Sequence, residues 1–430
     1  MPVPFITSVL YDGWPEYLPK PLTLVKYAGA VGALGLTKWY SMGASNLADR
    51  NMHGRVVVMT GATSGIGAEV ATEMASRGAQ LVLLTHLPAS DPFLVEYIDD
   101  MRSRTNNQMI YAEQVDLSSL HSVRQFATRW IDNAPPRRLD MIILCAATMT
   151  PAGGKRTETE EGVESTWMVN YLANFHLLGI LSPALRAQPF DRDVRIIVPT
   201  CSAYIGAPAL EKPLTGKDWT PNGAYARSKL ALMVFAEAFQ KHLDAYKRPD
   251  GLPANARVIL VDPGFARTPG MRRWLTRGWL AGLVFYVSFY VFFWLFFKSA
   301  KMGAQSIMFA ALESSFGRGP GGKFVKECME VDFARTDIRD EEVAKKLWEA
   351  SDKLIEATEK KAAAGRARAK KDEEKRAKEA EEKAQVDEIE ALVDTISKGK
   401  KKQKAKKEAE KSGPEPKTKG KKSKTGQKGT

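Results

Sequence analysis

Two side chains with complementary acid–base chemistry lie four residues apart in the segment Tyr225-Ala-Arg-Ser-Lys229. In a helix this spacing places both side chains on one face. A phenol with a pKa of about 10 is a poor acid–base catalyst at neutral pH, and a neighbouring ammonium lowers that pKa by stabilising the phenolate. The lysine can also hydrogen-bond a cofactor ribose. The pair predicts proton transfer at a substrate oxygen, but in a lysine-rich chain with 12 tyrosines the same spacing also arises by chance.

A glycine-rich turn follows a β-branched run closer to the N-terminus. Val56-Val57-Val58-Met59 leads into Thr60-Gly61-Ala62-Thr63-Ser64-Gly65-Ile66-Gly67, and residues 68–76 are compatible with a helix. A strand, tight turn and helix start leave backbone N–H groups free at the helix N-terminus, where the helix dipole favours a phosphate. A Cβ at the glycines would block the turn or keep a pyrophosphate away from the backbone. The loop predicts phosphate binding, although glycine-rich turns are common.

Alternating apolar runs and helical patterns must position these groups. The expected strands are Val56–Met59, Leu81–Leu84, Met109–Val115, Met141–Leu144, Arg195–Val198 and Val258–Val261. The expected helices between them are Ala68–Arg77, Pro92–Arg102, Leu120–Asn133, Glu161–Leu185 and Tyr225–Tyr246. This alternation predicts an α/β fold, a doubly wound parallel sheet with helices on both faces, and ligands at the C-terminal ends of the strands.

Six segments occur in an order that resembles the short-chain dehydrogenase/reductase family over about residues 53–330. They are the loop 60–67, Asp116-Leu117, Glu161-Gly-Val-Glu164 with Met168-Val-Asn170-Tyr171, Arg195-Ile-Ile-Val198, Tyr225-x-x-x-Lys229 and Asp262-Pro263-Gly264-x-x-x-Thr268. The helix at Glu161 and the long gap before Tyr225 look most like the retinol-dehydrogenase-like branch. The resemblance implies a Rossmann-type fold and hydride transfer between a nicotinamide and a substrate carbon.

The resemblance also implies roles for individual residues. Tyr225 is expected to donate or accept the proton, Lys229 to lower its pKa and bind the ribose, and Asn170 to hold a water in the proton relay. Asp116 is expected at the adenine amino group and Thr268 at the nicotinamide carboxamide. The expected cofactor-binding residues are Gly61, Ser64, Gly65, Ile66, Gly67, Thr85, His86, Asp116, Tyr225, Lys229, Pro263, Gly264 and Thr268.

The sequence departs from the family pattern at two strand ends. Where the family has Asn-Asn-Ala-Gly, this chain has Leu144-Cys-Ala-Ala147, a change expected to affect packing near the adenine more than catalysis. At the catalytic serine, an ungapped alignment places Cys201, and a shift of one residue places Ser202. Because a thiol is a weak hydrogen-bond donor, we favour Ser202 over Cys201 and Thr200 for this role. Cys201 would then pack at the strand end.

The end of the second expected strand bears on cofactor choice. NAD-binding members place an acidic residue there to hold both ribose hydroxyls. Here the chain reads Thr85-His86, so no carboxylate at this position would repel a 2′-phosphate. NADP(H) is therefore favoured over NAD(H).

Trp279–Phe297 is a run of 19 residues without a charge. As one helix it would reach about 28 Å, close to the thickness of a bilayer core. A single span would separate the family's last core strand, expected near Gly322–Val325, from its sheet, and basic residues flank both ends of the run. We therefore favour a monotopic insertion into a membrane leaflet or lipid monolayer. A buried homodimer contact and a hydrophobic lid over the pocket are the alternatives.

The remaining segments divide into a leader, 1–52, a domain, 53–335, a helix, 336–358, and a Lys/Glu-rich tail, 359–430. The leader contains a mildly apolar stretch, Leu22–Tyr40, which could contact a membrane surface. Residues 398–430 carry 14 Lys and 3 Glu, so they hold +11 of the net charge of +13. The tail is expected to be disordered and to act as a solvated spacer, an anionic-lipid contact or a nucleic-acid contact. Because no aromatic residue follows Trp348, nucleic-acid binding is the weakest of these.

These features favour an NADP(H)-dependent oxidoreductase that interconverts a carbonyl and an alcohol on a lipophilic substrate of the retinoid, sterol or long-chain lipid type. The expected location is the endoplasmic reticulum membrane or a lipid droplet, with the catalytic domain facing the cytosol. Three widely spaced cysteines, Cys145, Cys201 and Cys328, suggest a reducing compartment and have no metal-ligand spacing. The alternative is a cofactor-binding, weakly catalytic scaffold that recruits a partner to a membrane through its basic tail.

Overall fold

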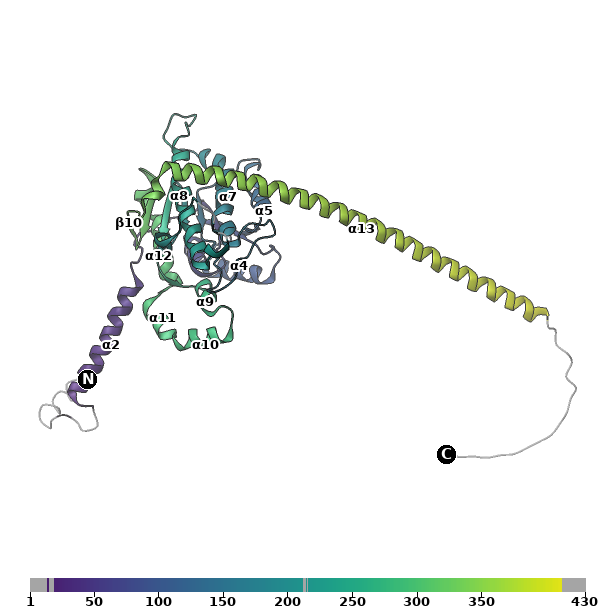
Figure 1. Ribbon diagram of the computed structural model, residues 1–430, viewed down its shortest axis with the longest axis horizontal. Helices are drawn as coiled ribbons and strands as arrows, with labels where there is room; N and C mark the ends of the chain where they lie inside the picture. Colours follow the sequence, from purple (N-terminus) through teal and green to yellow (C-terminus); the bar gives the residue numbers. More distant parts are fainter. Residues whose placement is uncertain (1–13, 15–18, 212–213, 215, 412–430) are drawn as a thin grey trace. The chain divides into compact units, whose positions relative to one another are not determined.

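An eight-stranded sheet forms the centre of the protein in its computed structural model, which describes residues 14, 19–211, 214 and 216–411 (Figure 1). The strand order is β10-β9-β6-β5-β4-β1-β2-β3, parallel throughout except for the antiparallel β9–β10 pair. The strands are β1 Val56–Thr60, β2 Gln80–Thr85, β3 Ile110–Gln114, β4 Met141–Leu144, β5 Val194–Pro199, β6 Ala256–Asp262, β9 Lys323–Lys326 and β10 Met329–Val331. The six expected strands and the expected last core strand are confirmed, whereas β10 was not foreseen.

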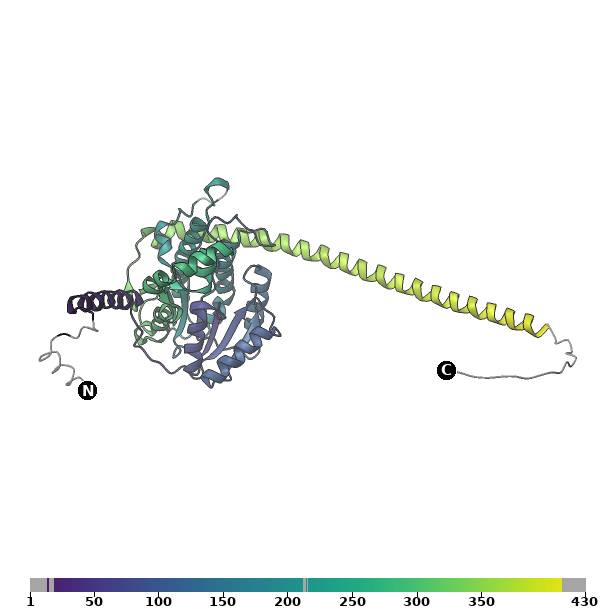
Figure 2. The same ribbon diagram turned by 90° about the horizontal axis from the view of Figure 1, so that it is seen from below.

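Helices cover both faces of this sheet (Figure 2). On one face lie α3 Gly65–Ser76, α4 Pro92–Thr105 and α12 Ala300–Leu312; on the other lie α5 Leu120–Ile131, α7 Ala173–Arg186 and α8 Pro221–Asp244. Local signals start these helices, since Asp91 caps α4 ahead of Pro92 and Thr220 caps α8 ahead of Pro221. The predicted doubly wound, Rossmann-type fold is confirmed.

One expected helix contains a wider turn. The segment Glu161–Leu185 forms α6 Ser165–Trp167, the π-helix η1 Met168–Leu172 and α7 without a break. Within the described chain, Ser165–Arg186 is the helix long and apolar enough to span a membrane, but 72% of it is buried inside the protein. It is therefore a helix of the core.

The apolar segment does not form one long helix. It makes two short ones, α10 Leu280–Ser288 and α11 Tyr290–Phe296, which follow α9 Pro269–Thr276. At 1.5 Å per residue, α10 is about 14 Å long, roughly half of a bilayer core. The insertion leaves the domain after β7 Ala266–Arg267 and returns at β8 Lys298–Ser299, which pairs with β7 in parallel. Both ends of the insertion thus lie side by side, and the chain returns to add β9 to the sheet.

The leader contributes α2, Pro21–Met42, in which no side chain is fully buried. Lys38 near its end donates hydrogen bonds from Nζ to the carbonyl oxygens of Trp294 (2.6 Å) and Phe297 (3.3 Å). Helix α2 therefore contacts α11, so two apolar segments far apart in the sequence lie together.

The last helix, α13, runs from Glu341 to Lys411, well beyond the expected end at residue 358. Lys, Glu and Ala are strong helix formers, and four-residue pairs such as Lys370–Glu374 and Lys375–Glu379 add to helix stability. Residues up to Lys361 belong to the first compact unit and those from Ala362 to a second. The expected disorder of the tail is therefore wrong for residues 359–411, which are helical; residues 412–430, like the first part of the leader, lie outside the described residues. Short 3₁₀ turns complete the structure: η2 Ser202–Gly206, η3 Gly216–Asp218, η4 Ser314–Gly317 and η5 Thr336–Arg339.

Candidate active site

A cavity of about 1230 Å³ opens at the C-terminal ends of β1, β2, β4, β5 and β6. It lies where the strand order reverses between β1 and β4, the usual ligand position in open α/β sheets. Every residue expected to bind the cofactor lines this cavity, as do Cys145, Thr200 and Cys201. Asn170 and Ser202, both expected to be catalytic, do not line it. The cavity therefore brings the cofactor set together and separates it from two of the expected catalytic residues.

The glycine loop leaves no space for side chains. Gly61 has a φ of +65°, and a Cβ there would lie 2.6 Å from the backbone nitrogen of Ala146. A Cβ on Gly67 would lie 2.1 Å from the carbonyl oxygen of Gly61. Ser64, in extended conformation, starts α3 without a side-chain cap, so the first N–H groups of this helix face the cavity. This cradle fits the pyrophosphate of a dinucleotide.

Loops after β3 and β6 bring to the cavity Asp116 and Thr268, the residues expected at the adenine and at the nicotinamide. The Asp116 carboxylate accepts hydrogen bonds from Ser118 N–H and O–H, both at 2.8 Å, which fixes its orientation. Thr268 caps α9 by accepting from Met271 N–H, and its Cβ would lie 3.4 Å from a Cβ placed on Gly65. Thr268 thus faces the glycine loop.

Tyr225 and Lys229 project from the first turns of α8. Lys229 donates from Nζ to the Pro199 carbonyl at 3.1 Å, and Nζ lies 5.9 Å from the Tyr225 ring centroid. The sequence predicts a lowered pKa for Tyr225, but the structure shows the opposite: burial raises the Tyr225 pKa well above its usual value, and Cys201 and Asp262 add to the rise. Burial also lowers the Lys229 pKa.

Of the residues considered for the catalytic-serine role, Cys201 and not Ser202 lies at the cavity. Cys201 lines the cavity and interacts electrostatically with Tyr225. The Ser202 hydroxyl instead donates to Asp262 Oδ2 at 2.5 Å and accepts from Lys326 Nζ at 3.1 Å. Thr200 Oγ1 is buried and has no hydrogen-bond partner among the described residues.

The Asn170 side chain connects two segments of the protein through hydrogen bonds. Its Oδ1 accepts from Thr148 N–H at 2.7 Å, while its Nδ2 donates to Thr148 O at 2.9 Å and to Ser228 Oγ at 3.1 Å. Both amide hydrogens are therefore used, and the side chain joins the segment after β4 to α8. Within this amide, the second lone pair of Oδ1 is the site left for the expected relay water.

The structure adds two features to the expected site. The first is an aromatic part of the cavity lining, formed by Phe265, Trp274, Phe293 and Phe297, for which the hydrophobic lid was the alternative drawn from the sequence. The uncharged run itself was its signal, since Phe293 and Phe297 belong to it. The second is the pair of charged groups, Asp262 and Lys326, that hold Ser202. They come from β6 and β9, and spacing gives no signal for such a long-range contact.

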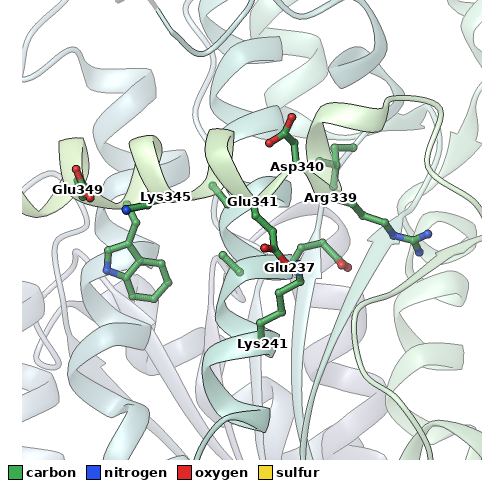
Figure 3. A pocket seen from close by; sticks show the side chains of 11 residues that line it. Glu237, Lys241, Arg339, Asp340, Glu341, Lys345 and Glu349 are labelled. Carbon is green, nitrogen blue, oxygen red and sulfur yellow. Dashed lines mark hydrogen bonds and ion pairs between the residues drawn. The ribbon is translucent and has the colours of Figure 1, made fainter.

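A second, smaller cavity of about 280 Å³ lies between α8 and the start of α13 (Figure 3). Glu237, Lys241 and Glu341 gather there, and Lys241 forms an ion pair with Glu341 at 2.7 Å. Burial raises the pKa of Glu237 to about 7, and one of its carboxylate oxygens has no partner among the described groups. This cavity shares no residue with the larger one.

Comparison with known proteins agrees with this geometry. Residues 55–277 match the family model described as short chain dehydrogenase. An uncharacterized oxidoreductase, pbr1, of Schizosaccharomyces pombe is 40% identical over 82% of this chain and 95% of that protein. Polyprenol dehydrogenase of Mus musculus is 32% identical over 69% of this chain and 82% of its own length, and mouse retinol dehydrogenase 13 is 29% identical over 75% and 90%. The chain is therefore an oxidoreductase of the short-chain dehydrogenase/reductase family, in its retinol-dehydrogenase-like branch.

Proposed function

We propose that this oxidoreductase uses NADP(H) to interconvert a carbonyl and an alcohol on a lipophilic substrate, at a membrane surface. One observation carries the proposal. One cavity is lined by the glycine loop, by Tyr225 and by two aromatic residues of the apolar insertion, Phe293 and Phe297. An apolar wall beside a proton donor suits a substrate whose polar group is confined to its reacting end.

The chain's residues then have distinct tasks. When bound, the nicotinamide supplies the hydride. In the reducing direction, the Tyr225 O–H gives its proton to the substrate oxygen. Lys229, held by Pro199, lies where it can bind the ribose, and the first N–H groups of α3 bind the pyrophosphate. Asn170 fixes α8, and with it Tyr225, by its bond to Ser228.

Support for NADP(H) comes from the end of β2. Thr85 is buried and its Oγ1 accepts from Leu87 N–H, while His86 is exposed at the edge of the cavity. A neutral or cationic imidazole tolerates a 2′-phosphate better than the carboxylate that NAD-binding sites place here. The expected result is a lower KM for NADPH than for NADH, and His86→Asp should reverse the preference. Equal KM values for both cofactors would contradict it.

Support for membrane contact comes from two segments. All side chains of α2 and of α10 are at least partly exposed, although both helices are largely apolar. An exposed apolar surface of this kind marks a lipid or protein contact. Lipid chains that surround α10 and α11 would also give a lipophilic substrate a path to the cavity wall. The expected location is the endoplasmic reticulum or a lipid droplet, which fluorescence microscopy of the tagged full chain checks.

Turnover tests the proposal directly. The full-length protein in detergent would be assayed for NADPH oxidation with retinoid, steroid, polyprenyl and long-chain aliphatic carbonyls. Wild type should reduce at least one class, and Tyr225→Phe should lose about 100-fold or more in kcat. Tyr111→Phe, at an exposed tyrosine on β3, is the matched control and should retain full activity. If wild type and Tyr225→Phe are equally inert, the scaffold hypothesis takes precedence.

A further inference from the structure

The end of β5 carries three consecutive side chains with a hydroxyl or thiol, and the structure gives each a different environment. Thr200 has an unpartnered buried hydroxyl, Cys201 faces Tyr225, and Ser202 faces Asp262. Cys201 continues the extended backbone of the strand, with φ −162° and ψ 157°, and Ser202 then begins η2. Cys201 and Thr200 line the cavity, whereas Ser202 does not.

The Ser202 hydroxyl already makes two hydrogen bonds within the protein. Its single hydrogen goes to Asp262, which is 1% exposed, and its oxygen accepts from Lys326. The other oxygen of the same carboxylate accepts from Gly264 N–H at 2.9 Å. Turning Ser202 towards a substrate would leave a buried carboxylate short of a donor, at a substantial cost in stability. Ser202 therefore stabilises the Pro263-Gly264 turn through Asp262. This turn lines the cofactor cavity.

The Cys201 thiol is in the opposite situation. Cys201 lines the cavity and interacts with Tyr225, which lines the same cavity. Burial raises the pKa of Cys201, so the sulfur keeps its hydrogen at neutral pH. An S–H group can donate to a substrate oxygen, although more weakly than an O–H group.

We infer that the Cys201 thiol, and not the Ser202 hydroxyl, is the second hydrogen-bond donor to the substrate oxygen beside Tyr225, while Ser202 is a positioning residue acting through Asp262. This inference rests on the proposed carbonyl–alcohol chemistry. The thiol donates a hydrogen bond, and no bond to sulfur forms or breaks. The proton that is transferred comes from Tyr225. Because the thiol is a weak hydrogen-bond donor, replacing it with a stronger donor should raise the reaction rate.

Four variants of the full-length protein test the inference by NADPH oxidation with the best carbonyl from the panel. Cys201→Ser should raise kcat by about threefold or more, and Cys201→Ala should lower it by about tenfold, both with unchanged NADPH affinity. Ser202→Ala should mainly weaken NADPH binding, because the loop at Gly264 loses its support. Cys328→Ser, at a thiol outside the cavity, is the matched control and should behave as wild type.

The reverse pattern would overturn the inference. If Ser202→Ala lowers kcat at unchanged NADPH affinity and Cys201→Ala stays within twofold of wild type, Ser202 is the donor. If wild type is active and Tyr225-dependent while Cys201→Ser is slower, the thiol is not the limiting donor. An inert wild type would instead refute the proposed function.

A second measurement needs no turnover. N-ethylmaleimide labelling followed by peptide mass spectrometry should show that NADPH slows modification of Cys201 by about fivefold or more, whereas Cys328 is labelled at the same rate with and without NADPH. Labelling of Cys201 at the same rate in both conditions would show that its thiol does not face the cofactor cavity, and the inference would fail.

Discussion

Membrane contact through the apolar insertion can be tested at three outward-facing side chains. Leu280, Val287 and Val291 are 78%, 64% and 69% exposed, and none of them lines the large cavity. Replacing all three by glutamine removes apolar surface from the outer side of α10 and α11. The cavity wall made by Phe293 and Phe297 stays intact, so folding and cofactor binding should not change.

The size of the effect follows from the exposed area. Complete burial of a Leu or Val side chain is worth about 1.5–3 kcal/mol, so about 70% of that leaves roughly 1–2 kcal/mol for each residue. Three residues then contribute roughly 3–6 kcal/mol to membrane partitioning. Since each 1.4 kcal/mol is about tenfold, the triple variant should partition roughly 10²–10⁴-fold less. Contact through α2 would keep the loss near the lower end of this range.

The assay is flotation of the full chain with neutral phosphatidylcholine vesicles at high salt, where the lysine-rich tail contributes little. The matched control replaces three exposed apolar residues on other surfaces, Phe93, Tyr111 and Leu252, by glutamine. The control should float like wild type. If the insertion variant also floats like wild type, or if both variants lose binding equally, the insertion is not the membrane contact.

Three further predictions concern the loop, the second cavity and the tail. Gly67→Ala should abolish NADPH binding and destabilise the protein by about 1–3 kcal/mol, because its Cβ would meet a carbonyl oxygen at 2.1 Å; Gly179→Ala, in helix α7 with nothing within 4 Å, should leave cofactor titration unchanged and stabilise the protein by about 0.5–1 kcal/mol. The pKa of Glu237, raised from 4.5 to about 7, means that the native state holds a proton that the unfolded chain releases, so stability should fall by about 1–2 kcal/mol as pH rises from 4.5 to 7, after allowing for partial exposure. Glu237→Gln should flatten that part of the denaturation profile, and an unchanged profile would exclude Glu237 as its source. Ending the chain after Lys361 should leave kcat unchanged, whereas ending it after residue 358 removes Glu359, which binds Arg124, and should lower the unfolding temperature measurably.

The sequence allowed the cofactor side of the site to be predicted because that side is made by backbone geometry. Gly61 and Gly67 are required where a Cβ would collide with backbone atoms, so residue type alone reveals the conformation. Parallel strand ends then bring Asp116, Tyr225 and Thr268 to one edge of the sheet. The sequence therefore predicts that these residues lie together, without any information on how their side chains are oriented.

The catalytic side could not be predicted in the same way. Whether Cys201 or Ser202 faces Tyr225 depends on where the extended backbone of β5 ends, and a shift of one residue reverses the answer. The charged groups that hold Ser202 lie on two other strands and are distant in sequence. Likewise, burial raises the pKa of Tyr225, with Cys201 and Asp262 adding to the rise, and the four-residue spacing does not reveal these neighbours.

The apolar insertion links the two proposals about membrane and substrate. Its base is closed by the β7–β8 pair, so it cannot move away from the domain without breaking this pairing. Its inner side chains, Phe293 and Phe297, form one wall of the cavity, while side chains such as Leu280 and Val291 on the same two helices are exposed. A lipid leaflet around these helices would therefore lie against the part of the cavity lining that Phe293 and Phe297 form. A substrate that remains in the leaflet could then reach the catalytic groups without entering water, which explains why an enzyme of this family would place its longest apolar run at this point in the chain.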